Sequence, residues 1–162
     1  MLRTVTTADE LREIDSSPWA VLLLTADWSK YAAYARKVIT RVSSTFPVSH
    51  PEIDVRFFVM EEGEPFADVW IDRFEIPYLR PLTADPHTVL GNGSVLLLRN
   101  GKVAWFYPHL MGQAGQTLPP NLIVGFREAL DVAGGKLIEE KILYLARGIQ
   151  ENAPADRDSP NQ

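Results

Sequence analysis

The sequence predicts an α/β domain in which helices flank a central mixed β-sheet. Three observations favour this class. Two short apolar stretches, at residues 19–24 and 53–60, are typical of strands buried on both faces, and a helical pattern follows the first of them. Between two further strand-like runs, Asn100-Gly101 marks a tight antiparallel hairpin. Buried strands joined by helices and followed by a hairpin give a sheet of mixed direction.

Helices are expected before, between and after these strands. Thr7 and Glu10 have the spacing of a capping box and begin a short first helix. Apolar residues at helical spacing predict a second helix over residues 29–45, which Pro47 closes. A proline in the first position and a run of apolar residues on one side predict a third helix over residues 65–74.

The second half of the chain is predicted to hold a long loop, the hairpin and two helices. Residues 75–94 contain prolines and glycines without a clear period, so we expect a loop that ends just before the hairpin. After the hairpin a second loop leads to a helix over residues 121–133, which Gly134-Gly135 breaks. A last helix follows, with its apolar residues on one face: Ile138, Ile142, Leu145, Ala146 and Ile149.

Length and composition indicate one domain with an ordinary hydrophobic core. The chain has 162 residues, of which 46% are hydrophobic and 23% are charged, as in a typical globular protein. We expect the domain to span residues 1–150, including the extra C-terminal helix. The polar tail, residues 151–162, shows no periodicity and is predicted to be disordered.

The composition also excludes several classes of function. The chain contains no cysteine, which excludes disulfides, thiolate metal sites, iron-sulfur clusters and a cysteine nucleophile. Its net charge is -5 and its basic residues are scattered, so nucleic acid is not an expected partner. No apolar run approaches the roughly 18 residues of a membrane helix, and the first residues do not resemble an export signal. We therefore expect no membrane association and a cytoplasmic location.

Two segments resemble the thioredoxin superfamily. The run LTADWSKYA at residues 24–32 resembles the active-site segment of that family, in which a strand leads through an acidic residue into Trp, Cys, two further residues and Cys. The run VLLLRNGKV at residues 95–103 resembles the last hairpin of the family, and Gly112 stands where a glycine usually follows it. Together with the predicted order of elements, the resemblance implies a thioredoxin-like fold over roughly residues 7–133, with an extra C-terminal helix.

The departures from this family imply a redox-inactive member. Ser29 and Ala32 occupy the two cysteine positions, so the attacking thiolate and the resolving thiol are both missing. Leu23 stands where redox-active members keep a buried aspartate. Where the family places a cis-proline before the hairpin, this chain has Gly93-Ser94, and the nearby Pro77 lies further back in the predicted loop.

The other polar candidates have weak support from the sequence. Ser29 would start a helix, where it serves either as a cap or as a nucleophile, but no histidine lies near it in sequence to act as its base. The three histidines, His50, His87 and His109, are too far apart in sequence for a zinc motif. The acidic residues at positions 61, 62 and 64 lack the pattern of a calcium loop. We expect no metal and no cofactor.

The resemblance places five residues at one end of the sheet as a candidate protein-binding face: Trp28, Ser29, Tyr31, Gly93 and Ser94. Aromatic residues at such a position are suited to anchor a partner. The alternative is that Trp28 and Tyr31 pack beneath the loop of residues 75–94.

Three hypotheses for the function remain open at this point. The first is a redox-inactive thioredoxin-like domain that binds a protein, for example as an assembly factor or chaperone. The second is an enzyme or small-molecule binder that works through Ser29, Asp27 and a loop residue. The third is a structural subunit, with a possible homodimer, that acts through its last helix.

Overall fold

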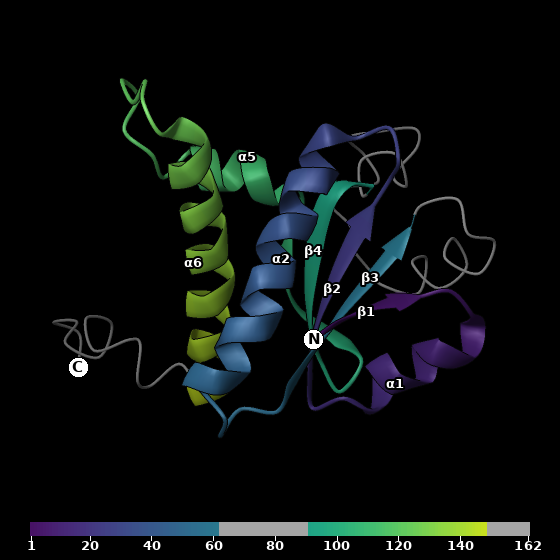
Figure 1. Cartoon of the computed structure of the whole chain (residues 1–162). Helices are drawn as coiled ribbons and strands as arrows, with labels where there is room; N and C mark the ends of the chain where they lie inside the picture. The colour runs from purple at the N-terminus through teal and green to yellow at the C-terminus, as the bar shows by residue number, and fades with distance from the viewer. Residues whose placement is uncertain (62–90, 149–162) are drawn as a thin grey trace, which may run out of the picture.

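The computed structural model describes residues 1–61 and 91–148, and these form a mixed sheet with helices on both faces (Figure 1). The strands, in the order β1-β3-β2-β4-β5 across the sheet, are β1 Leu2–Val5, β2 Trp19–Thr25, β3 Val55–Glu61, β4 Asn92–Arg99 and β5 Lys102–Tyr107. The helices are η1 Ala8–Glu10, α1 Leu11–Ser16, α2 Lys30–Ser49, α5 Leu110–Gly115 and α6 Phe126–Arg147. The predicted α/β class with a mixed sheet and a C-terminal helix is confirmed.

Several predicted segments lie outside the described residues. These are the helix predicted over residues 65–74, residues 75–90 of the predicted loop, including Pro77, and the tail 151–162. The end of that predicted loop is wrong, because β4 already begins at Asn92.

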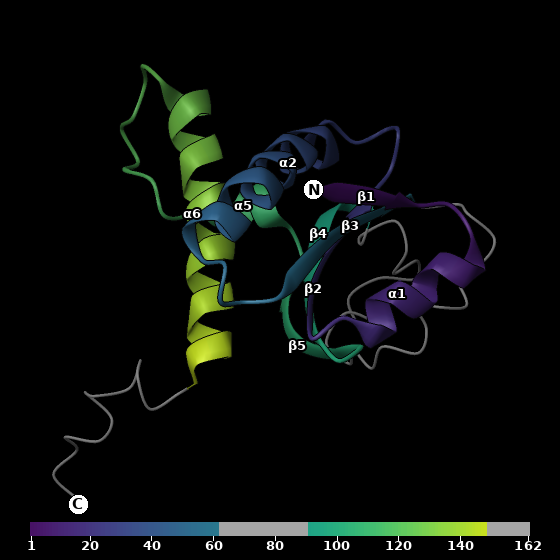
Figure 2. The same cartoon turned by 60° about the horizontal axis from the view of Figure 1, so that its bottom comes forward.

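Strand β2 is the central strand, as its apolar run predicts. It pairs in parallel with β3 and antiparallel with β4, and every residue after Trp19 is buried. Alternate side chains of β2 enter two different cores. Leu22 and Leu24 lie in the core on the α1 face, whereas Val21 and Leu23 lie in the core beneath α2, α5 and α6. Figure 2 shows α1 on one side of the sheet and the other three helices on the opposite side.

The predicted hairpin between β4 and β5 is confirmed. Asn100 and Gly101 have φ values of 51° and 81°, the left-handed conformation that both central residues of a type I′ turn adopt. Glycine and asparagine are the residues that adopt this conformation most readily.

The first helix and the strand before it differ from the prediction. Thr7 does not cap the helix with its side chain; instead the Glu10 carboxylate accepts hydrogen bonds from the hydroxyls of Thr6 and Thr7, at 2.9 and 3.0 Å. These bonds stabilise the ionised form and lower the pKa of Glu10. Strand β1, at the edge of the described sheet, was not predicted because it has only four residues, of which one is buried.

Helix α2 is longer than predicted, because it continues through Pro47 to Ser49. A proline cannot donate a hydrogen bond to the carbonyl four residues earlier, and its ring crowds that carbonyl, yet α2 continues for two residues beyond Pro47. That carbonyl, of Ser43, accepts a hydrogen bond of 3.3 Å from the amino group of Met1 instead.

The predicted break at Gly134-Gly135 is wrong, since α6 is one helix of 22 residues that runs through both glycines. Both are buried, and α6 packs there against α2. A Cβ atom on Gly134 would lie 3.4 Å from a methyl group of Val38, and one on Gly135 would lie 3.5 Å from Val42. The two glycines therefore allow close contact between helices, which a search for local helix breakers cannot distinguish from a break.

Substitutions at Gly134 test this assignment. Gly134→Ala places its methyl group at ordinary contact distance, and it gains about 0.5–1 kcal/mol of helix propensity, so the melting temperature should stay equal or rise. Gly134→Leu has no room against Val38 and should cost about 1–3 kcal/mol by forcing the helices apart. Thermal unfolding followed by circular dichroism measures both. If alanine and leucine destabilised the protein equally, Gly134 would be needed for its backbone conformation and not for the close contact with α2.

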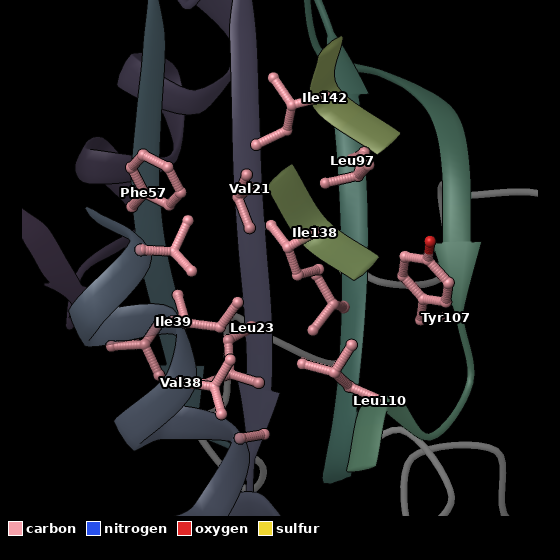
Figure 3. Close-up of a cluster of buried hydrophobic side chains, with 14 of the residues drawn as sticks. Val21, Leu23, Val38, Ile39, Phe57, Leu97, Tyr107, Leu110, Ile138 and Ile142 are labelled. Carbon is pink, nitrogen blue, oxygen red and sulfur yellow. The ribbon is translucent and has the colours of Figure 1, made fainter. Parts of the chain in front are cut away.

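The core beneath α2, α5 and α6 extends to Tyr107 of β5 (Figure 3). Its ring is buried, and its hydroxyl lies 3.4 Å from the carbonyl oxygen of Leu137, to which it donates. Burial, together with the nearby charge of Glu140, raises the pKa of Tyr107 to about 12.

Alkaline pH should therefore destabilise the protein through Tyr107. Its phenol ionises near pH 10 in the unfolded chain but near pH 12 in the folded one, so the unfolded state loses the proton first. The resulting stability is complete below pH 10 and falls between pH 10 and 12, by up to about 1.4 kcal/mol per pH unit. Urea unfolding at several pH values measures it, with Tyr107→Phe as the control. A slope in this range that Tyr107→Phe leaves unchanged would assign the effect to other groups.

Candidate functional site

Ser29 begins α2 and acts as its N-cap. The backbone is extended at Ser29, and its hydroxyl oxygen accepts a hydrogen bond of 3.1 Å from the backbone N–H of Ala32. This is the bond that an N-cap serine makes, and it satisfies one of the free amides of the first turn. Of the two roles considered for Ser29, the structure shows the cap.

The same hydroxyl ties α2 to the start of β4. Ser29 donates a hydrogen bond to the side-chain oxygen of Asn92, so its donor and its acceptor are both engaged. Its side chain is only 5% exposed. A serine nucleophile needs a base that accepts its proton, and here that proton is directed to a neutral amide oxygen, which is not a base. Ser29 is therefore held as a structural link.

Gly93 and Ser94 continue this contact beneath the surface. Gly93 has a φ of 89°, and a Cβ atom on it would lie 3.3 Å from the carbonyl oxygen of Tyr31 and from the Cβ of Ala35. Only glycine suits both this conformation and this close approach. Ser94 is fully buried, and its hydroxyl donates a hydrogen bond of 2.6 Å to the carbonyl oxygen of Pro108. The start of β4 is thus fixed to α2 and to the end of β5.

Two aromatic side chains lie exposed over this fixed base. Trp28 is 59% exposed and Tyr31 is 42% exposed. The Tyr31 ring meets the His109 ring edge-on with the centroids 4.9 Å apart, and the ammonium group of Lys30 lies 5.5 Å from its centroid. These contacts restrict Tyr31 while leaving much of its surface accessible.

His109 is held in turn by the short helix α5. Its Nδ1 accepts a hydrogen bond of 2.7 Å from the backbone N–H of Gly112, so the neutral ring carries its proton on Nε2. A Cβ atom on residue 112 would lie 2.6 Å from that Nδ1, which explains the glycine at this position. The His109 ring is thereby oriented toward Tyr31.

The structure brings all five predicted site residues to one end of the sheet, but gives them different roles. Trp28 and Tyr31 are exposed, whereas Ser29, Gly93 and Ser94 are buried and can only position them. We name this region the Tyr31 face and define it as Trp28, Tyr31 and His109.

Sequence reasoning did not place Asn92 and His109 in this site. Asn92 lay in a predicted loop, and His109 was considered only as a metal ligand. Ser29 and Asn92 are 63 positions apart in the sequence, and no local sequence pattern predicts a contact over such a separation. Within the described residues, no group of three His, Asp or Glu side chains could hold a metal ion. The helices of the same part of the chain include none that is long and apolar enough to cross a bilayer.

Comparison with solved structures identifies the fold. The oxidised thioredoxin from Plasmodium falciparum superposes with a TM-score of 0.51 at 16% identity, and covers 88% of this chain and 99% of its own. The zinc-bound form of human ERp44 superposes with a TM-score of 0.53 at 12% identity, over 88% of this chain and 31% of its own. The chain has a thioredoxin-like fold. Neither a protein-family model nor a curated protein sequence matches it.

This thioredoxin-like domain has no residue that could carry out thiol-disulfide exchange. With no cysteine in the chain, there is neither a thiolate to attack a disulfide nor a thiol to resolve one. Leu23 is fully buried in the core beneath α2, so this position holds an apolar side chain and not the buried aspartate of redox-active members. None of the described peptide bonds is cis, including those at Gly93-Ser94.

Introducing cysteines at positions 29 and 32 tests the placement of this segment. Ser29 is the N-cap and Ala32 lies in the first turn of α2, so their side chains lie close enough for a disulfide to form in Ser29→Cys/Ala32→Cys. We expect the double variant to oxidise within the monomer, as measured by thiol titration and mass spectrometry. Ser29→Cys alone is the control and should keep its thiol. Failure of the double variant to oxidise while folded would mean that the segment is placed incorrectly.

Proposed function

We propose that this chain is a redox-inactive thioredoxin-like domain that binds a protein partner through the Tyr31 face. The observation that carries the proposal is the exposure of Trp28 and Tyr31 over Ser29 and Ser94, which are buried and hydrogen-bonded. Such a module would serve as an assembly factor or chaperone for its partner.

The chemistry of the face favours a protein over a small molecule. Small ligands bind in concave sites with converging polar groups. Here the buried hydroxyls beneath the aromatic residues are already engaged: Ser29 with Asn92, and Ser94 with the carbonyl of Pro108.

The rigidity of the face supports the proposal in a second way. Ordering side chains on binding costs about 0.5–1.5 kcal/mol for each flexible residue. Tyr31 is already oriented by His109, which is itself held by Gly112. Large aromatic side chains that lose little freedom on binding are typical anchors at the centre of an interface.

Site-specific photo-crosslinking tests the proposal. A photoreactive amino acid replaces Trp28, which is 59% exposed, and in a matched control it replaces Val48, which is 80% exposed at the end of α2. In native lysate the probe at position 28 should give a discrete adduct that position 48 does not. The adduct should disappear when an excess of unlabelled protein competes. Identical adducts from both positions, or none from position 28, would contradict the proposal.

A further inference from the structure

A groove runs along the exposed side of α6, away from the residues of the Tyr31 face. It has a volume of about 660 Å³ and lies between α6, from Glu128 to Glu140, and the segment that contains Thr117 and Leu118. The chain between α5 and α6 projects away from the sheet at the start of α6 (Figure 1). The floor of the groove is formed by small and apolar residues of α6: Ala129, Val132, Ala133 and Leu137.

Exposed apolar side chains are concentrated in the first half of α6 and in the segment just before it. Of the ten large apolar side chains that are exposed in the described residues, four lie within residues 123–132. They are Ile123 and Val124, each 86% exposed, Val132 at 63% and Phe126 at 47%. A concentration of this kind on one surface is typical of an interaction site rather than of single exposed residues.

The charges around the groove have a pattern that is complementary to itself. Glu128 lies one turn before Val132, and Lys136 lies one turn after it. Both are exposed, and within the described residues neither has an ion-pair partner. Negative, apolar and positive groups thus follow one another along the line of α6.

A two-fold axis at Val132 would satisfy this pattern. In an antiparallel pairing of α6 with α6 of a second copy, each Val132 meets its equivalent, and Glu128 faces Lys136 of the other copy twice. The remaining charged residue that lines the groove, Glu140, then lies opposite the segment just before α6 of the other copy, which carries no charge at residues 123–125, so no like charges that line the groove oppose each other. A parallel pairing would instead set Glu128 against Glu128 and Lys136 against Lys136.

We propose that the groove of α6 is a homodimer interface, and that its occupant is α6 of a second copy of this chain. The start of each α6 then lies beside the end of the other, where Ile123 and Val124 of one copy cover the groove near Leu137 of its partner. The interface is isologous and closed, since both copies use the same patch. It is independent of the Tyr31 face, so either proposal can fail without the other.

Charge reversal at the two positions provides the test. Wild type, Glu128→Lys, Lys136→Glu and the double variant are compared by sedimentation equilibrium from about 1 to about 100 µM. Glu128→Lys opposes two pairs of lysines and Lys136→Glu two pairs of glutamates, so each single variant should weaken the dimer about tenfold or more. The double variant restores both ion pairs and should dimerise like wild type.

Mixing the two single variants separates the interface from any effect on folding. In the mixed dimer the lysine introduced by Glu128→Lys in one copy faces the glutamate introduced by Lys136→Glu in the other. The native Lys136 of the first copy faces the native Glu128 of the second. The mixture should therefore form heterodimers although neither variant dimerises well alone. A wild type that stays monomeric up to about 100 µM would overturn the proposal. The proposal would also be overturned if the single variants had the same dimer dissociation constant as wild type. Failure of both the mixture and the double variant to recover association would overturn it too.

Discussion

Ile138→Asp is expected to unfold the protein at room temperature. Ile138 has no exposed surface and projects from α6 into the core formed with β2, β4 and α2, where Figure 3 shows it beside Val21 and Leu97. Removing a buried isoleucine costs about 2–5 kcal/mol. The aspartate adds the cost of burying a carboxyl without a partner, so the sum approaches the whole stability of a domain of this size.

The matched control is Val48→Asp, because Val48 is 80% exposed in the last turn of α2. An acidic residue there meets the negative end of the helix dipole, and the loss should stay below about 1 kcal/mol. Circular dichroism and urea unfolding compare the two variants.

Deletion of the chain from Lys136 removes Ile138 and Ile142 together and should cause aggregation, since the apolar residues beneath α6 become exposed. A soluble truncated protein with an unchanged melting temperature would show that α6 is peripheral.

Tyr31→Glu is expected to abolish partner binding while the fold stays intact. Tyr31 is 42% exposed, so the carboxylate reaches solvent in the free protein and the circular dichroism spectrum should not change. In a complex the same carboxylate would be buried in place of an aromatic anchor. The loss of such an anchor alone costs about 2 kcal/mol or more, which is roughly a thirtyfold weaker dissociation constant.

The measurement is titration calorimetry with the partner identified by crosslinking. Val48→Glu serves as the matched control, since it adds the same charge at an exposed apolar position of the same helix. His109→Ala removes both the edge contact with Tyr31 and the bond from Gly112, and should weaken binding less than Tyr31→Glu does. If Tyr31→Glu and a matching change at Trp28 both leave the dissociation constant unchanged, the Tyr31 face is not the binding surface.

The parts of the fold that could be predicted are those with a local signal. The apolar run that begins at Trp19 indicates a buried strand, and Asn100-Gly101 indicates a tight turn, independently of the rest of the chain. The break assigned to Gly134-Gly135 was wrong because a glycine pair has two physical uses. It weakens a helix locally, but it also lets another helix approach, and only the position of α2 decides between them.

The candidate site was predictable only in outline. The resemblance placed Trp28, Ser29 and Tyr31 at the start of a helix, and the structure puts them there. It could not show that Ser29 donates to Asn92, or that the His109 ring meets Tyr31 edge-on, since these contacts join segments that are distant in sequence. Exposure was also undecided from sequence, because an aromatic residue at a helix start suits a core as well as a surface.

The link between Ser29 and Asn92 has a consequence for how the Tyr31 face responds to its surroundings. In a thioredoxin-like fold this position ordinarily carries sulfur, but here a hydroxyl and an amide, which peroxide and disulfide reagents do not attack, hold the two segments together. The sulfur atoms of the chain belong to three methionines, of which Met60 and Met111 are buried and only Met1 is exposed. We therefore expect the geometry beneath Trp28 and Tyr31 to be the same in an oxidising and in a reducing environment.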